Sequence, residues 1–284
     1  MTMLSAVLLS FGARAATNIQ ENNSSITLSA GVSRLVFNKS DGTVTSLRLG
    51  SIELVKDKSG LRPDFWREMT TEDFSNNIPE RSAKWKKLSV TGTETATEPD
   101  GAVSLRVTYE PDFTLTYKLY GNGMLDVSLL LPPSAEPFQE PIILDGPGMV
   151  YDPNRSEEEL RAEIERFRSA VEFFQKEERK RWLQEQALIP CVGMLTRLPA
   201  KFVCQTHNGK LVATDARSRG FVLQPLTELQ FSTLSPGSFT ELRIDAPQPE
   251  KEEIGAYNLP SDEIHLSFRL VGVKDAASLA AALL

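Results

Sequence analysis

The sequence lacks most of the features that would assign an activity at once. No stretch approaches the roughly 20 consecutive apolar residues of a membrane-spanning helix. A nucleophile elbow, a phosphate-binding P-loop and a dinucleotide-binding glycine motif are all absent. Basic residues do not predominate either, because the net charge is −7, so nucleic acid is not an expected partner. These absences leave a folded protein of 284 residues with no standard catalytic signature.

Cysteine and histidine are also scarce, with two of each. Cys191 and Cys204 lack the C-x-x-C spacing of a zinc site, and His207 and His265 lie far apart in the chain, so we expect no metal and no cofactor. The two cysteines flank Pro199. A hairpin there would allow a Cys191–Cys204 disulfide in an exported protein, whereas two buried free thiols are the alternative.

The N-terminal segment raises the question of export. An apolar run from Leu4 ends in Ala13-Arg14-Ala15, which offers small residues at the −3 and −1 positions of a cleavage site. The charged start of a signal peptide is missing, and a buried first strand is the alternative. We interpret residues 1–23 as a signal peptide and linker, which predicts a secreted or periplasmic protein, with a cytoplasmic protein as the alternative.

Most of the chain has the pattern of antiparallel β-structure. Hydrophobic residues make up 40% and charged residues 24%, enough apolar surface for a packed core. Apolar and polar residues alternate through about 24–135 and again through 189–273, as in strands with one buried face. Turn sequences separate the alternating runs: Asp41-Gly42, Pro99-Asp100-Gly101, Gly121-Asn122-Gly123 and Asn208-Gly209.

One segment, 153–188, differs from the rest and predicts an inserted helix at about 156–188. Ser156 and Glu159 form the pattern of a capping box at its start. Its apolar residues recur at spacings of four and three: Leu160, Ile164, Phe167, Val171 and Phe174. This stripe suits packing on a sheet face, docking to a partner, or a coiled coil of about two regular heptads. The C-terminal tail, 274–284, is expected to form a short helix.

The segment LRPDFWREMTTEDF at 61–74 carries a resemblance to a known family. Together with the alternating run before it and Trp85 after it, it resembles the small chain of family 2 β-galactosidases. Phe65, Trp66 and Arg67 match the family's strand end, and Thr70 and Asp73 match its acidic loop, in which Thr71 and Glu72 are departures. The family's Gly-Pro-x-Glu-Asn-Tyr segment and its late tryptophan-bearing loop have no counterpart.

The resemblance implies a mainly β fold, an antiparallel β-supersandwich of the galactose-mutarotase type at 24–273. It also implies that the catalytic glutamates lie on a barrel outside this chain, so we expect no catalytic residue here. The expected function is a non-catalytic, β-galactosidase small-chain-like domain in carbohydrate degradation. Its partners would be a carbohydrate, a glycosidase barrel subunit whose site it completes, or both. Sugar binding or domain docking is assigned to Trp66, Arg67, Glu72, Asp73 and Trp85, with a packing role for Trp66 and an Arg67–Asp73 pair as the structural alternative.

Two other functions stay open. The chain is alternatively a structural or interaction protein that docks through helix 156–188. A mutarotase- or lyase-type enzyme is the third alternative, and it would need Tyr117, Tyr120 or His265 beside acids on a concave sheet.

Overall fold

The computed structural model describes residues 15–66, 87–110, 112–132, 156–186, 191–247 and 263–284. The chain divides into two compact units. The larger unit contains Met1–Pro132, Pro190–Gln248 and Asp262–Leu284, and the smaller contains Pro133–Ile189 and Pro249–Ser261. The predicted signal peptide lies almost wholly outside the described residues.

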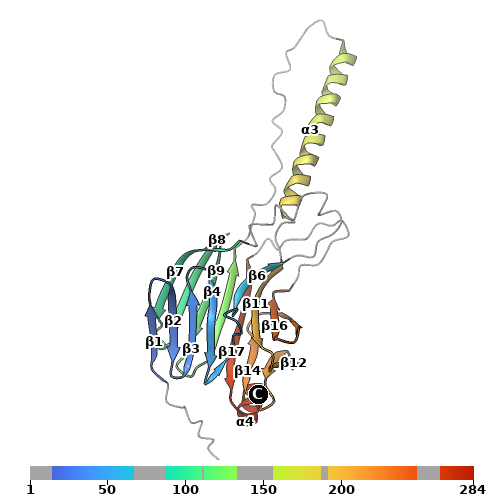
Figure 1. Ribbon diagram of the computed structural model, residues 1–284. Coiled ribbons are helices and arrows are strands. Elements are labelled where there is room, and N and C mark those ends of the chain that lie inside the picture. Colours follow the sequence, from blue (N-terminus) through green and yellow to red (C-terminus); the bar gives the residue numbers. More distant parts are fainter. Residues whose placement is uncertain (1–14, 67–86, 111, 133–155, 187–190, 248–262) are drawn as a thin grey trace, which may run out of the picture. The chain divides into compact units, whose positions relative to one another are not determined.

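Three antiparallel sheets build the larger unit (Figure 1). The first has the order β1 (Thr17–Glu21), β2 (Ser25–Ala30), β3 (Ser33–Asn38), β4 (Thr43–Leu49) and β5 (Ile52–Glu53). The second, with eight strands, has the order β12 (Val203–His207), β13 (Lys210–Thr214), β14 (Gly220–Pro225), β17 (Ile264–Val273), β10 (Leu125–Leu131), β9 (Phe113–Leu119), β8 (Val103–Glu110) and β7 (Ser89–Thr97). The third has the order β15 (Gln230–Leu234), β16 (Phe239–Asp245), β11 (Cys191–Pro199) and β6 (Arg62–Trp66). The prediction of a mainly β, antiparallel fold with one long inserted helix is confirmed.

The two stretches of strands that the sequence separates share sheets in the structure. β10 pairs with β17, so the eight-stranded sheet joins strands from before and after the helix. β6 pairs with β11 and thereby joins the four-stranded sheet from the far side of the helix. The eight- and four-stranded sheets therefore each need both stretches, whereas the five-stranded sheet comes from the first stretch alone.

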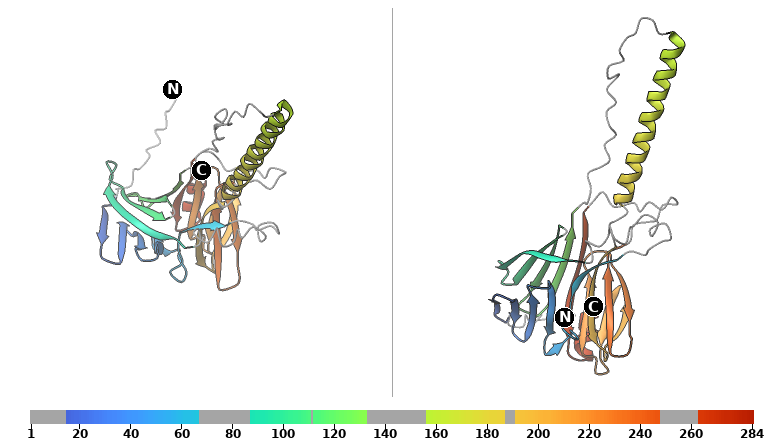
Figure 2. Two further views of the ribbon diagram at one scale, coloured as in Figure 1. Left: turned by 90° about the horizontal axis from the view of Figure 1, so that it is seen from above. Right: turned by 45° about the horizontal axis from the view of Figure 1, so that its top comes forward.

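Aromatic residues form the core where the sheets face one another. Figure 2 shows the blue strands of the five-stranded sheet opposite the green strands of the eight-stranded sheet. Phe37 of the first sheet meets Tyr117 of the second with ring centroids 6.3 Å apart. Phe65 of the four-stranded sheet meets Phe113 edge-on at 4.9 Å. All four side chains are buried, so the three inner faces share one core.

Turn chemistry explains the predicted hairpins, which the structure confirms. Asp41-Gly42 lies between β3 and β4, and the Asp41 carboxylate accepts from the Thr43 amide at 3.1 Å. Gly42 has a φ of +66°, and a Cβ there would lie 2.7 Å from the ring of Tyr109. The Tyr109 hydroxyl in turn donates to the Gly42 carbonyl at 2.7 Å. The turn is thereby fixed against the eight-stranded sheet.

The prediction for residues 1–23 needs one correction, because residues 17–21 are strand β1 and not linker. The side chain of Asn22 makes the turn into β2, accepting from the amides of Ser24 at 2.9 Å and Ser25 at 2.8 Å. The Thr17 hydroxyl donates to the Gly101 carbonyl at 2.8 Å, which ties β1 to the β7–β8 turn. Such contacts across the chain are invisible to local patterning.

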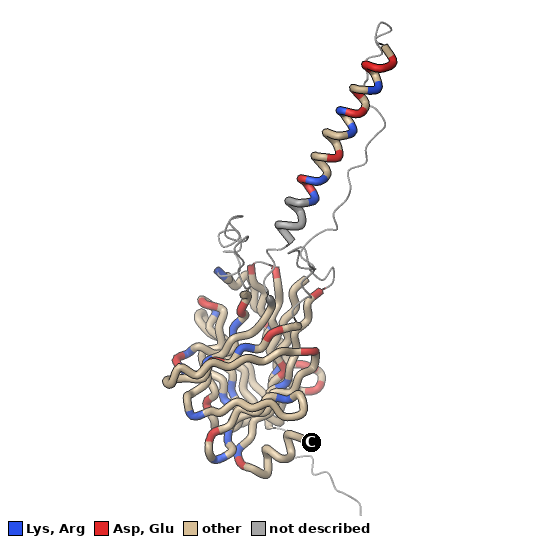
Figure 3. The backbone as a smooth tube through the Cα atoms, turned by 90° about the vertical axis from the view of Figure 1, so that its right-hand side faces the viewer, with Lys and Arg blue, Asp and Glu red and all other residues tan. Residues whose placement is uncertain are grey.

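Two helices lie among the described residues. α3 (Glu157–Gln186) begins with the predicted capping box, in which the Glu159 amide donates to Ser156 Oγ at 3.3 Å and the Ser156 amide donates to Glu159 Oε2 at 2.9 Å. Figure 3 shows acidic and basic residues interspersed along it. α4 (Ala276–Leu283) is the predicted C-terminal helix, and Gln224 Nε2 of β14 donates to its Ala282 carbonyl at 3.1 Å.

Candidate functional site

Two carboxylates share the outer face of the four-stranded sheet. In the register of β6, β11 and β16, Gly193 stands directly between Asp64 and Asp245. Residues that lie opposite one another in antiparallel strands point to the same face. With only a glycine between them, the two acids face each other across the middle strand.

Trp66 and Arg243 complete this group, which we call the acid–indole cluster (Asp64, Trp66, Arg243 and Asp245 around Gly193). Trp66 Nε1 donates to Asp245 Oδ1 at 3.2 Å. The Arg243 guanidinium lies 5.0 Å from the centre of the Trp66 ring. Its Nε is 3.1 Å from Asp64 Oδ2, an ion pair whose angles fall short of a hydrogen bond. The cluster therefore joins three strands through side chains as well as through their backbones.

Gly193 is required by this arrangement. A Cβ at Gly193 would overlap Asp245 Oδ1 and would lie 2.9 Å from the Ile244 carbonyl oxygen. The Asp245 carboxylate, which accepts the hydrogen bond from Trp66, thus occupies the space that a side chain at position 193 would fill. Glycine is needed here because the Asp245 carboxylate approaches the backbone closely, and not because the backbone takes an unusual φ angle.

Burial dominates the electrostatics of Asp245, which is 5% exposed. Burial raises the pKa of Asp245 to about 6, with a smaller upward effect from Asp64, while the Trp66 hydrogen bond and Arg243 act in the opposite direction. A carboxyl group with this pKa changes its protonation state close to neutral pH. It accepts a hydrogen bond when ionised and can donate one when protonated.

A pocket of about 310 Å³ opens beside β6, the last strand of the four-stranded sheet among the described residues. Asp64 belongs both to this pocket and to the acid–indole cluster. The lining comes from β6, from the β3–β4 turn and from two residues of the eight-stranded sheet region: Asp41, Gly42, Thr43, Arg62, Pro63, Asp64, Phe65, Leu88 and Tyr109. Its volume is at the lower end for small-molecule sites, and its carboxylates and guanidinium suit a small polar ligand.

The structure places one of the five residues predicted for sugar binding or docking. Trp66 lies in the acid–indole cluster, where its N–H is used by Asp245 and one of its faces by Arg243. Arg67, Glu72, Asp73 and Trp85 lie outside the described residues. The other members of the cluster were not predicted, since Asp245 is 179 residues from Trp66.

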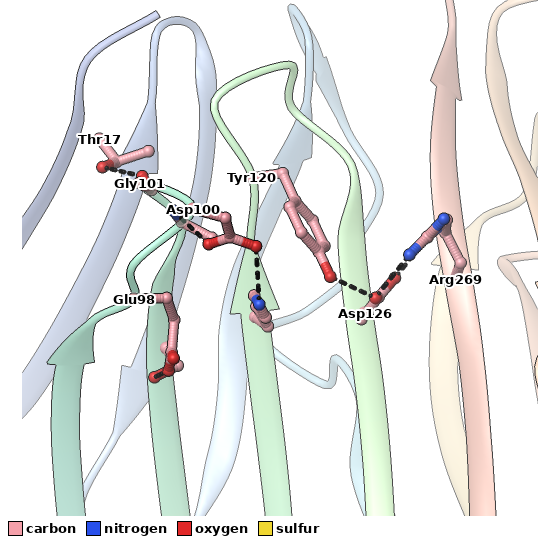
Figure 4. Close-up of polar contacts among 10 residues, drawn as sticks. Thr17, Glu98, Asp100, Gly101, Tyr120, Asp126 and Arg269 are labelled. Carbon is pink, nitrogen blue, oxygen red and sulfur yellow. Dashed lines mark hydrogen bonds and ion pairs between the residues drawn. The ribbon is translucent and has the colours of Figure 1, made fainter. Parts of the chain in front are cut away.

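A second polar group lies on the outer face of the eight-stranded sheet (Figure 4). Arg269 of β17 holds Asp126 of β10 through two hydrogen bonds of 2.7 and 2.8 Å, and the Tyr120 hydroxyl donates to the same carboxylate at 2.8 Å. Asp126 raises the pKa of Arg269 and keeps it charged. This arrangement satisfies a carboxylate within the protein, which is a structural role.

The residues that a mutarotase- or lyase-type enzyme would need also make hydrogen bonds within the protein. Tyr117 is completely buried and its hydroxyl donates to the Leu61 carbonyl at 3.2 Å. Tyr120 donates to Asp126, and His265 Nε2 lies 2.7 Å from Ser128 Oγ. Within the described residues, no group of three or more histidine, cysteine or acidic side chains is placed to hold a metal ion.

Of the two alternatives for Cys191 and Cys204, a disulfide or free thiols, the disulfide is not formed in the structure. Cys204 is a free thiol on β12, and burial raises its pKa to about 11. β11, which begins at Cys191, belongs to the four-stranded sheet, whereas β12 belongs to the eight-stranded sheet. The turn at Pro199 therefore carries the chain from one sheet to the other, and the hairpin on which the prediction depended does not exist.

The five predicted stripe residues lie on α3 and are all at least partly exposed. Leu160, Ile164, Phe167 and Phe174 range from 36% to 60% exposed, and Val171 is half-buried. In the part of the chain that the structure describes, no helix is both long enough and apolar enough to span a membrane.

Comparison with known proteins yields three findings. A family model described as the β-galactosidase small chain matches residues 29–209. A β-galactosidase from Priestia megaterium (strain DSM 319 / IMG 1521) is 28% identical over 156 residues, which are 52% of this chain and 14% of that enzyme. Among solved structures, heparan sulfate lyase HepC from Pedobacter heparinus aligns with 91% of this chain and 36% of its own, with a TM-score of 0.45 and 9% identity.

Proposed function

Because this chain belongs to the β-galactosidase small-chain family, we propose that it is a non-catalytic part of a glycosidase. It binds sugar, or completes the sugar site of a separate barrel subunit that carries the catalytic acids. The matched segment covers only 14% of the Priestia megaterium enzyme. The proposal therefore includes a partner, the barrel subunit, which would carry out the hydrolysis.

The acid–indole cluster beside the pocket at β6 is the observation that carries the proposal. A sugar presents hydroxyl groups that donate to carboxylates and accept from guanidinium groups. Asp64 and Arg62 line the pocket from one strand. The ion pair with Arg243 holds the Asp64 carboxylate in place. The site is thus polar and held rigidly by neighbouring strands, as recognition of hydroxyls requires.

Trp66 has a positioning role in this proposal. Its N–H already donates to Asp245, and Arg243 covers one of its ring faces. It therefore anchors the end of β6, the strand that carries both Arg62 and Asp64. Direct contacts with sugar are assigned to those two residues.

The interaction-protein alternative is favoured by one observation, the exposed apolar stripe of α3. It accounts for the helix and leaves the acid–indole cluster unexplained. The two functions are compatible, since the stripe and the cluster use different residues.

Titration with galactose, followed by NMR of the Trp66 indole N–H, tests the sugar-binding part. We expect a saturable shift of this signal, because Arg243, which covers the Trp66 ring, is ion-paired with Asp64. The shift should be lost in Asp64→Ala and kept in Asp100→Ala, whose carboxylate pairs with Lys118 on the β7–β8 side of the molecule. No shift at any galactose concentration would refute sugar binding by the chain alone and leave completion of a barrel site as the proposal.

A further inference from the structure

The apolar stripe of α3 has the spacing of a two-stranded coiled coil. Leu160, Ile164, Phe167, Val171 and Phe174 follow one another at intervals of four, three, four and three residues. This pattern places Ile164 and Val171 at heptad positions a, and the other three at positions d. Single exposed apolar residues need no explanation, but a continuous row along two heptads of a helix does.

The residue types at these positions favour a dimer. β-Branched residues at position a with Leu at position d favour two parallel strands. Both a positions here are β-branched, and Leu160 occupies one of the three d positions, the other two being Phe. The row ends where Glu178 takes the next a position, so the seam is confined to Leu160–Phe174. A seam of this length gives a dimer that dissociates on dilution.

The charges beside the seam favour a parallel pair of identical helices. Glu163 is at position g and Arg168 at position e of the next heptad, which are the positions that meet across a parallel dimer. Two identical helices would therefore form this ion pair twice. The next pair of such positions, Ala170 and Gln175, is uncharged. An antiparallel pair sets positions a opposite positions d, and in the register that pairs Phe167 with Val171 it would instead bring the two Arg168 side chains together.

We propose that α3 pairs with α3 of a second copy of this chain, as a short parallel coiled coil with its seam at Leu160–Phe174. The proposal is independent of sugar binding. Packing of the stripe against another part of the same chain, or against a different protein, is the competing outcome of the tests below.

Sedimentation of the full chain over a hundredfold range of concentration tests the association. We expect the mass to rise from that of one chain, 31.5 kDa, toward twice that value. Phe167→Asp should weaken the dimer by on the order of a hundredfold, because it removes two aromatic side chains from the seam and places two carboxylates there. Phe173→Asp is the matched control, because Phe173 is 67% exposed and lies at position c, outside the seam. A monomer at every concentration, or equal weakening by both substitutions, overturns the proposal.

Cross-linking tests the orientation. In a background of Cys191→Ser and Cys204→Ser, oxidation of Leu160→Cys should give a covalent dimer, because equivalent d positions meet in a parallel pair. Phe173→Cys should cross-link much more slowly. Glu163→Arg and Arg168→Glu should each weaken the dimer, and the two together should restore it. A dimer in which Leu160→Cys does not cross-link, or in which the double substitution is no better than the single ones, would refute the parallel arrangement.

Discussion

Replacing Gly193 with alanine should destabilise the protein by about 2–4 kcal/mol. The added Cβ would overlap Asp245 Oδ1 and lie 2.9 Å from the Ile244 carbonyl oxygen. Forcing one extra carbon into a packed site costs about 1–3 kcal/mol. Displacing Asp245 also breaks its hydrogen bond with Trp66, which adds about 1 kcal/mol.

The measurement is the free energy of unfolding from urea denaturation of the full chain. Gly92→Ala is the matched control, since Gly92 is also in a strand but a Cβ there would meet only Thr108, at 3.9 Å. We expect Gly92→Ala to change the free energy of unfolding by less than about 1 kcal/mol.

A double-mutant cycle identifies the cause of the loss. In an Asp245→Ala background, Gly193→Ala should cost about half as much, because only the contact with Ile244 remains. Equal costs of Gly193→Ala with and without Asp245, or a cost no larger than that of Gly92→Ala, would refute the reasoning about the cluster.

Two further predictions concern charge. Asp245 has its pKa raised to about 6, so the folded state holds the proton more tightly than the unfolded state, and its contribution to stability is present below about pH 4 and lost as the pH rises through 6. Asp245→Asn should therefore gain about 3 kcal/mol relative to the wild type between about pH 4 and pH 7 in urea denaturation, and an unchanged difference across that range would contradict the raised pKa. Asp126→Asn should lower the free energy of unfolding by about 1–3 kcal/mol in the same assay, because it weakens a two-bond pair with Arg269 that is mostly shielded from water. The control, Arg161→Ala on exposed α3, should lower it by less than about 0.5 kcal/mol. Similar losses from the two substitutions would show that the Asp126 pair is no more than a surface contact.

The parts of the fold that the sequence predicts are those with local causes. Asp41-Gly42 makes a turn because glycine accepts its positive φ, and Ser156 and Glu159 start α3 because each satisfies the backbone of the other. β1 was missed because its strand TNIQE carries a single large apolar residue, Ile19, and depends on pairing with β2.

The candidate site was only partly predictable, because it depends on contacts between distant segments. The family pattern singled out Trp66, but its partners Arg243 and Asp245 lie in a strand with no unusual composition. Only the register of β6, β11 and β16 brings them together. Gly193 belongs to no turn sequence or motif. Its role is evident only from the structure, where the Asp245 carboxylate lies in the space that a Cβ at position 193 would need. For the same reason the sequence left open whether Cys191 and Cys204 form a disulfide, since spacing cannot tell whether Pro199 turns a hairpin or a crossing between sheets.

Mixing this chain with a β-galactosidase barrel subunit from the same source, and measuring hydrolysis of nitrophenyl β-galactoside, tests the central claim most directly. The account predicts activity that appears only on mixing and saturates with added chain. It also predicts weaker complementation by Gly193→Ala than by Gly92→Ala. Hydrolysis by the chain alone would contradict the non-catalytic assignment, and no gain on mixing would contradict completion of a barrel site.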